Sequence, residues 1–408
     1  MLSEKLFTKD FTLILIGQII SLFGNAILRF ALPLYLLRET GSASLFGIVT
    51  ACSFLPMIFL SFFGGILADR VNKRNIMVAL DFITALVVFS LYFLLGHIPI
   101  VPLFIVVLIL LYGISGTYQP TVQASIPALM SSENILPASA IINQIGAISG
   151  LLGPIIGGAL FGAFGIMPIL VISIFCFLFS AIMEIFITIP YTKRTENFGI
   201  CTIIKNDFHD SLNYITHEKP LLLKIIILIA VFNLVLSAMI IVGIPILIIN
   251  TLKMSDSLLG ITQGAMALGG FCGGIFTAMM AKKLKFENSH FLLLICGITV
   301  GIMAIPLFFK LENIIGYISI TILSFLAMAF ATIFTVQMLA KVQKETPPEL
   351  VGKVIALMMS IAMCAQPLGQ VLYGFAFDIF PNNSGFILTV AGLLSVISAF
   401  ILKKIIHS

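Results

Sequence analysis

Continuous apolar stretches of twenty or more residues recur along this chain, separated by short polar turns. A helix satisfies its own backbone N–H and C=O groups in lipid, so stretches of this length predict membrane-spanning helices. A transmembrane β-barrel would instead show segments of about ten residues with alternating polarity. The chain is therefore expected to be an all-α membrane protein.

The overall composition leads to the same class. Hydrophobic residues make up 60% of the chain and charged residues 10%, whereas soluble domains carry roughly 25% charged residues. No soluble fold of this length could shield so much apolar surface from water, so the lipid bilayer is the expected surrounding. The net charge of +5 gives no indication of a nucleic-acid partner.

The apolar stretches predict twelve transmembrane helices. They lie near residues 11–38, 44–68, 75–95, 100–128, 138–163, 166–189, 220–250, 256–281, 289–309, 314–342, 350–378 and 384–403. An even number places both termini on one side of the membrane. Eighteen of the 22 Lys and Arg residues fall on that side, which the positive-inside rule assigns to the cytoplasm. We therefore expect a multi-pass protein of a bacterial inner membrane.

The longest polar segment separates the sixth and seventh predicted spans. It divides the chain into an N-terminal six-helix bundle, residues 1–189, a cytoplasmic linker, residues 190–219, and a C-terminal six-helix bundle, residues 220–408. Apolar residues recur in the linker at helical spacing, which predicts an amphipathic helix at the membrane surface; an irregular linker is the alternative. These residues are Ile204, Phe208, Leu212 and Ile215.

Short segments of the first half recur in the second half at a nearly constant offset. The repeat contains six helices, so the two copies share one orientation, as in transporters whose halves rock around a central cavity. The matches are residues 32–34 with 244–246, 42–48 with 255–261, 64–66 with 273–275, and 153–154 with 366–367.

The loop after the second predicted span contains a glycine, an aspartate and a basic cluster at set spacing: Gly65, Asp69, Arg70, Lys73 and Arg74. It resembles the signature loop of the major facilitator superfamily, although Asn72 stands where that loop usually has glycine. The resemblance implies a fold of two parallel six-helix halves and a gate in which Asp69 accepts hydrogen bonds from a facing helix N-terminus. The alternative is that the basic residues only anchor the loop in the cytoplasm.

The fifth predicted span carries a second motif, made of Gly150, Gly153, Pro154, Gly157 and Gly158. It resembles the superfamily's Gly-Pro-x-x-Gly-Gly motif, which is associated with exporters that run as antiporters. Small residues at this spacing also allow close helix packing, which is the structural alternative.

Segments 116–129, 133–138 and 347–354 resemble a subgroup of the superfamily that holds macrolide-efflux proteins and the enterobactin exporter. One departure is that the fourth span lacks the buried Arg that many proton-coupled exporters carry there.

Two carboxyl groups fall inside predicted spans, Asp81 in the third and Glu184 in the sixth. An ionised group inside a bilayer is costly and is a functional candidate by default. Either could carry the coupling proton; the alternative is a local ion pair.

Polar residues of the first span form one helical stripe, Gln18, Ser21, Asn25 and Arg29. We assign Gln18, Asn25 and Arg29 to a substrate cavity, together with Gln119, Gln123 and Asn143. Hydrogen bonds between helices are the alternative role for these side chains.

The predicted function is secondary active efflux of a drug-like, macrolide-like or siderophore-like molecule by alternating access, with proton antiport. The alternatives are a nutrient symporter or uniporter, or a lipid translocator, of the same fold. We expect no enzymatic activity, no metal and no cofactor, with the proton gradient as the energy source. The expected partners are the substrate and the bilayer, and the expected form is a monomer.

Overall fold

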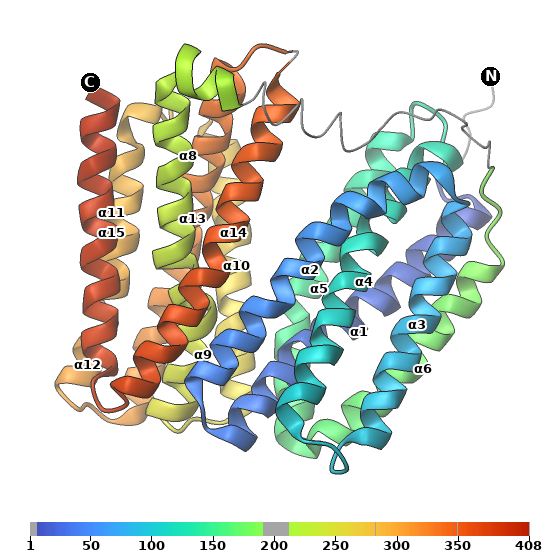
Figure 1. The fold of residues 1–408 in the computed structure, drawn as a ribbon, viewed down its shortest axis with the longest axis horizontal. Helices are drawn as coiled ribbons and strands as arrows, with labels where there is room; N and C mark the ends of the chain where they lie inside the picture. Colours follow the sequence, from blue (N-terminus) through green and yellow to red (C-terminus); the bar gives the residue numbers. More distant parts are fainter. Residues whose placement is uncertain (1–5, 191–211, 282, 349, 408) are drawn as a thin grey trace. The chain divides into compact units, whose positions relative to one another are not determined.

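The computed structural model describes residues 6–190, 212–281, 283–348 and 350–407 (Figure 1). Within α2 the side chains of residues 62, 63, 65, 66 and 69 lie outside this description. In the described ranges, twelve helices are long and apolar enough to cross a membrane. The predicted all-α membrane fold is therefore confirmed.

The first six spans are continuous helices. The Thr8 hydroxyl caps the first of them, and Gly41 ends it with a left-handed backbone, φ 63°, a conformation that glycine adopts without steric cost. Their bounds are α1 Lys9–Thr40, α2 Ala43–Arg70, α3 Lys73–Leu94, α4 Ile100–Leu129, α5 Ile135–Phe164 and α6 Ile166–Ile185.

The second six spans begin after the short π-helix η1 (Tyr214–Glu218). Two of them are composite: the seventh alternates α-helical and π-helical turns, and the ninth is interrupted near Pro306. The seventh comprises α8 Pro220–Phe232, η2 Asn233–Ser237, η3 Met239–Gly243, α9 Ile244–Ile246 and η4 Leu247–Thr251. The remainder are α10 Asp256–Met280, η5 Phe286–Asn288, α11 Ser289–Ile302, α12 Ile305–Phe308, α13 Asn313–Glu345, α14 Val351–Ile379 and α15 Ser384–His407.

The sixth span ends earlier than the sequence predicts, at Ile185 instead of residue 189. After the helix, the backbone N–H of Thr188 donates to the Asp10 carboxylate of α1 at 2.9 Å. Hydrophobicity continues past Ile185, but this bond holds the chain in a non-helical path beside α1. The prediction was therefore wrong by one helical turn.

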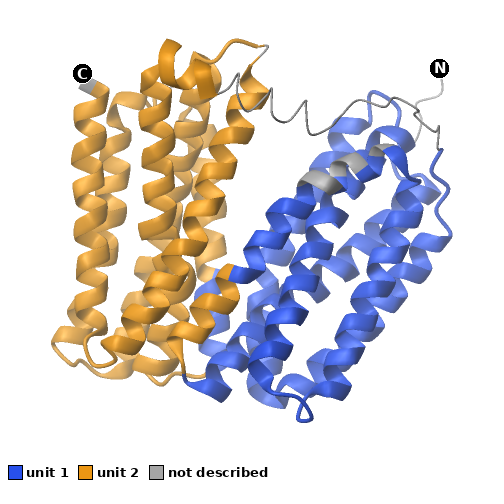
Figure 2. Cartoon of the chain, in the orientation of Figure 1, with its two compact units in different colours: residues 1–41, 52–195, 256–264 blue, residues 42–51, 196–255, 265–408 orange. Residues whose placement is uncertain are grey.

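The described residues group into two compact units (Figure 2). Unit 1 comprises residues 1–41, 52–195 and 256–264, and unit 2 comprises residues 42–51, 196–255 and 265–408. The first turns of α2 thus belong to unit 2 and those of α10 to unit 1. The predicted boundaries at residues 189 and 219 stay predictions.

The predicted linker helix falls mostly on residues 191–211. Ile204 and Phe208 lie outside the described residues. Of the other two apolar positions, Leu212 is exposed and Ile215 is buried in η1. The Tyr214 hydroxyl donates to the carbonyl of Glu345, which holds η1 against the end of α13.

The two units repeat one packing pattern. In unit 1, α3 packs against α4 and α6, and α1 against α5; in unit 2, α11 packs against α13 and α15, and α8 against α14. Gly153 of α5 abuts Ala26 of α1, while Gly369 of α14 abuts Ala238 between η2 and η3. Because the two contacts are equivalent, Gly153 and Gly369 occupy corresponding positions in the two halves. The sequence match of residues 153–154 with 366–367 was therefore three residues out of register.

Candidate functional site

Six polar side chains from four helices meet inside unit 1. All are at most 4% exposed in a bundle that is otherwise strongly apolar. We call them the buried polar cluster: Gln18 and Ser21 of α1, Asp81 of α3, Tyr118 of α4, and Ser180 and Glu184 of α6.

A hydrogen-bonded chain runs through this cluster from α1 to α6. The Gln18 amide donates to the Tyr118 hydroxyl at 2.8 Å, and that hydroxyl donates to Glu184 Oε1 at 2.5 Å. The Ser21 hydroxyl donates to Asp81 Oδ1 at 3.2 Å. Both proton-coupling candidates of the sequence therefore lie in the buried polar cluster, and each accepts a hydrogen bond from a hydroxyl group of a neighbouring helix.

Gly17 lets α1 and α6 approach closely at this point. The Ser180 hydroxyl donates to the Gly17 carbonyl at 3.2 Å. A Cβ atom at Gly17 would lie 3.3 Å from the Ser180 hydroxyl and 3.6 Å from Cγ of Glu184. An alanine there would press on the Ser180 hydroxyl and would only touch the Glu184 side chain.

The cluster has more acceptors than donors. Asp81 Oδ2, Glu184 Oε2 and Gln18 Oε1 are buried and have no hydrogen-bond partner. Among the described residues, no Lys, Arg or His forms an ion pair with either carboxyl group. An unpaired buried carboxylate costs several kcal/mol, so this arrangement requires a bound positive charge.

The predicted polar stripe of α1 divides into two parts. Gln18 and Ser21 belong to the buried polar cluster, whereas the Asn25 amide donates to the Ser21 carbonyl of its own helix at 3.1 Å. Arg29 is half-buried, and its guanidinium lies 4.2 Å from the ring centre of Tyr112, a cation–π contact. Its Nη2 also lies 3.9 Å from the sulfur of Met57.

The remaining cavity candidates lie on α4 and α5. The Gln123 amide donates to the Asn143 side-chain oxygen at 3.0 Å, which joins the two helices. Gln119 is half-buried and follows Tyr118 directly. The structure thus places these residues on neighbouring helices, and their substrate role stays a prediction.

The candidate gate spans the turn between α2 and α3. Asn72 caps α3, because its side-chain oxygen accepts from the Arg74 N–H at 3.0 Å. Arg70 is exposed, and Lys73 and Arg74 are half-buried. The side chains of Gly65 and Asp69 lie outside the described residues, so the gate stays a prediction.

The glycines of the candidate antiporter motif make different contacts. Gly153 and Gly157 face α1, while Gly158 lies against the backbone of α10 at Asp256 and Gly260. Space is open around a Cβ atom at Gly150. Three of the motif's four glycines therefore serve close helix approach, as small residues commonly do between membrane helices.

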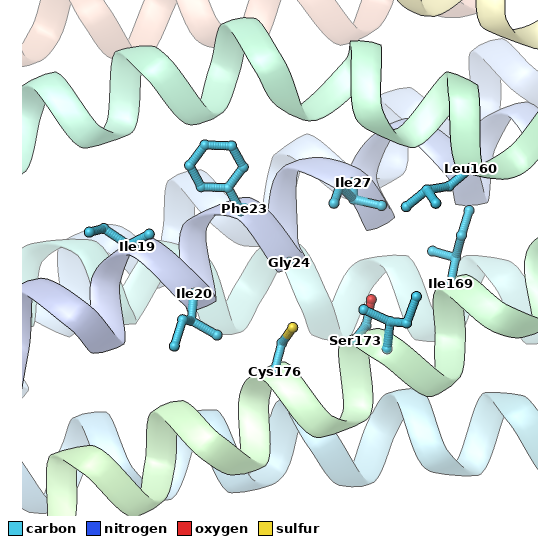
Figure 3. Close-up of a pocket in the computed structure, with 10 residues that line it drawn as sticks. Ile19, Ile20, Phe23, Gly24, Ile27, Leu160, Ile169, Ser173 and Cys176 are labelled. Carbon is cyan, nitrogen blue, oxygen red and sulfur yellow. The ribbon is translucent and has the colours of Figure 1, made fainter.

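An apolar groove of about 230 Å³ lies between α1, α5 and α6 of unit 1 (Figure 3). Its lining includes Phe23, Ile27, Leu160 and Ile172, together with Gly24 and the polar residue Ser173. The buried polar cluster contributes no side chain to this lining, so the groove and the cluster are separate features.

In unit 2, Asp378 caps the first turn of α2. Its carboxylate accepts from the backbone N–H groups of Ala43 and Ser44, both at 2.8 Å, and from the Ser42 hydroxyl at 2.9 Å. The first N–H groups of a helix have no partner inside the helix, and the helix dipole favours an anion there. Asp378 therefore supplies the hydrogen-bond acceptor and the negative charge that favour the start of α2.

Asp378→Asn should lower the stability of the purified protein by about 1 kcal/mol, because a neutral amide leaves part of this cap unsatisfied. The measurement is the unfolding temperature in detergent. Glu312→Gln is the matched control, since Glu312 precedes α13 without a side-chain capping bond. Equal unfolding temperatures for the two variants would contradict the capping role.

Sequence reasoning missed two members of the cluster as site residues, Tyr118 and Ser180. Tyr118 also packs in an apolar core with Phe11 and Val122, so it lies where that core meets the cluster. A buried phenol hydroxyl usually has a hydrogen-bond partner, so a tyrosine inside a span was the sequence feature that could have indicated a polar contact. It could not identify the partner, which lies on a helix 66 residues away in sequence.

Comparisons with known proteins agree with this architecture. The Major Facilitator Superfamily profile matches residues 14–370. Macrolide efflux protein A of Streptococcus pyogenes is 23% identical over 380 residues, which cover 91% of this chain and 90% of that protein. Multidrug efflux pump Tap of Mycolicibacterium fortuitum is 22% identical, with 89% and 88% covered.

Among solved structures, the nucleoside transporter NupG superposes with a TM-score of 0.73 at 15% identity, covering 97% of this chain and 99% of that one. This likeness establishes the shared fold. Because the superfamily profile matches residues 14–370, which is most of the chain, the protein belongs to the Major Facilitator Superfamily.

Proposed function

We propose that this transporter exports an amphipathic small molecule, of drug-like, macrolide-like or siderophore-like chemistry, in exchange for protons. The observation that carries the coupling is the pair of buried carboxyl groups, Asp81 and Glu184, which no described cation neutralises. A group that must bind positive charge inside a membrane bundle is suited to exchange protons between the two sides.

The direction of transport is supported by two further observations. The relatives named above are an efflux protein and an efflux pump. The glycines of the candidate antiporter motif provide the close contacts of α5 with α1 and α10. In an alternating-access cycle, the cavity would release substrate outside and take up protons there.

The proposed topology follows from the charge bias of the loops. We place the protein in a bacterial inner membrane as a monomer, with both termini in the cytoplasm. Reporter fusions at residues 1 and 408 should both be active only in the cytoplasm; a periplasmic signal from either end would contradict this orientation.

Export should collapse when the proton gradient is removed. Everted vesicles containing the protein would be supplied with macrolides, cationic dyes and catecholate siderophores, with and without a protonophore. We expect accumulation of at least one class and its loss with the protonophore, because protons that leave the acidic vesicle lumen in exchange for substrate supply the energy.

Vesicles from cells that lack the protein are the control. Accumulation that persists without the gradient would contradict proton coupling. Transport in the opposite direction in right-side-out vesicles, driven by proton symport, would instead establish uptake.

A further inference from the structure

An apolar groove lies at an equivalent place in each of the two units. The groove of unit 1 lies between α1, α5 and α6 (Figure 3). The groove of unit 2, about 290 Å³ in volume, lies between η2, α14 and α15. These elements belong to the first, fifth and sixth spans of each set of six. The groove is therefore a feature of the repeated architecture and not of one irregular contact.

The correspondence extends to single lining residues. Ile169, Ile172 and Cys176 of α6 line one groove, and the residues 218 positions later, in α15, line the other. The corresponding pairs are Phe23 with Val235, Leu160 with Ala376, Ile169 with Ile387, Ile172 with Val390, and Cys176 with Leu394. Two different sets of side chains thus form the same kind of concave surface.

The groove of unit 1 lies on the side of α1 that faces away from its polar residues. Ile27 follows Gln18 by about two and a half helical turns, so the two side chains lie on opposite faces of α1. At the borders of the two grooves, Ile172 is 47% exposed and Leu372 is 62% exposed. In helices that span a membrane, such exposed apolar side chains contact lipid. Both grooves are therefore continuous with apolar surface that the bilayer covers.

The lining of both grooves suits a hydrocarbon chain. Among the described residues that form the two linings, none carries a charge, and each lining has one hydroxyl-bearing side chain, Ser173 in unit 1 and Tyr373 in unit 2. α5 and α6 pack only loosely against each other, as do α14 and α15, so a space stays open between them. The walls of an unfilled apolar space lose dispersion contacts. Within a bilayer, lipid chains are the apolar groups that restore them.

From this geometry we propose that each groove is a binding site for one hydrocarbon chain of a phospholipid. Leu160 lies one turn before the end of α5, and Phe380 directly follows α14, so each groove reaches toward the turn that joins its last two helices. The polar head group of the lipid would stay near that turn while the chain enters the groove. Occupancy of these sites requires neither a direction of transport nor a coupling ion.

The test uses the full-length protein in liposomes that contain phosphatidylethanolamine with a diazirine on its acyl chain. Irradiation links the chain to the residues that it touches, and mass spectrometry of peptides locates the links. The control surface is the exposed apolar face of α3, where Leu86 is 61% exposed. The yield in each groove should exceed the yield on α3 at least about fivefold, because a chain in a groove has partner atoms on several sides. Equal yields would overturn the proposal.

Ala376→Phe places a large side chain in the groove of unit 2 and leaves the groove of unit 1 as an internal control. Links at Val390 should fall at least about fivefold in this variant, while links at Ile172 should stay at the wild-type yield, which also shows that the variant is folded. Ala278→Phe changes an exposed alanine of α10 and should leave both grooves unchanged. A wild-type yield at Val390 in Ala376→Phe would overturn the site in unit 2.

A competition experiment separates lipid from transported substrate. Excess erythromycin should leave the links in both grooves unchanged, because its many polar groups would find few partners in these linings. Excess phosphatidylethanolamine without the diazirine should lower them. Protection by erythromycin would assign the grooves to the substrate and would overturn the proposal.

Discussion

Gly153→Ala should destabilise the protein, and Gly150→Ala, one turn earlier in α5, should not. A Cβ atom at Gly153 would overlap the methyl group of Ala26 and press on the backbone of α1. Neither group can rotate away, so the helices must separate. Overpacking of this kind costs about 1–3 kcal/mol.

Gly150 belongs to the same motif, but space is open around it. Alanine favours the helix there by about 1 kcal/mol relative to glycine, so Gly150→Ala should be neutral or stabilising. The measurement is the unfolding temperature of the purified protein in detergent. Equal losses in both variants would show that the motif does not act through contact with α1.

Arg29→Ala should strongly lower the exchange of substrate across the membrane. The guanidinium is held over Tyr112 and beside Met57, in the half of α1 beyond the buried polar cluster. A half-buried cation inside a span is costly unless it serves binding or pairing. No described carboxylate forms an ion pair with it, so we expect it to hold an oxygen of the substrate.

Exchange of labelled erythromycin should fall at least about tenfold in Arg29→Ala, the loss expected when a charged hydrogen bond to a ligand is removed. Arg29→Lys should recover it only in part, because an ammonium lacks the planar stacking of a guanidinium. Lys224→Ala removes an exposed cation from α8 and is the control. Wild-type exchange by Arg29→Ala would remove this residue from the substrate site.

Much of the fold could be predicted because the bilayer imposes a simple rule on backbone hydrogen bonds. Each of the twelve predicted spans corresponds to a described helix, and most ends agree within a few residues. The π-helical turns between Asn233 and Thr251 could not be predicted. Apolar side chains indicate that a segment spans the membrane. They do not determine whether each backbone N–H bonds to the carbonyl four residues earlier, as in an α-helix, or five residues earlier, as in a π-helix.

The sequence predicted which residue types belong to the candidate site, but it did not predict which side chains lie together. Asp81 and Glu184 were visible because charges in spans are rare. Their meeting depends on how α3, α4 and α6 rotate about their axes, which an almost uniformly apolar sequence does not specify. For the same reason the stripe from Gln18 to Arg29 was expected to serve one cavity, although it divides between two environments.

The paired glycine contacts also carry historical information. Gly153 contacts Ala26, and Gly369 contacts Ala238, which lies 212 residues after Ala26. In the same way, Gly64 contacts Thr117, and Gly273 contacts Ala329, which lies 212 residues after Thr117. At that spacing Ala230 corresponds to Gln18 and Phe330 to Tyr118. A trait found in both copies was present before the ancestral gene duplicated, whereas a trait of one copy was gained or lost afterwards. The close helix packing is thus the ancestral trait, and the buried polar cluster records the divergence of the two copies.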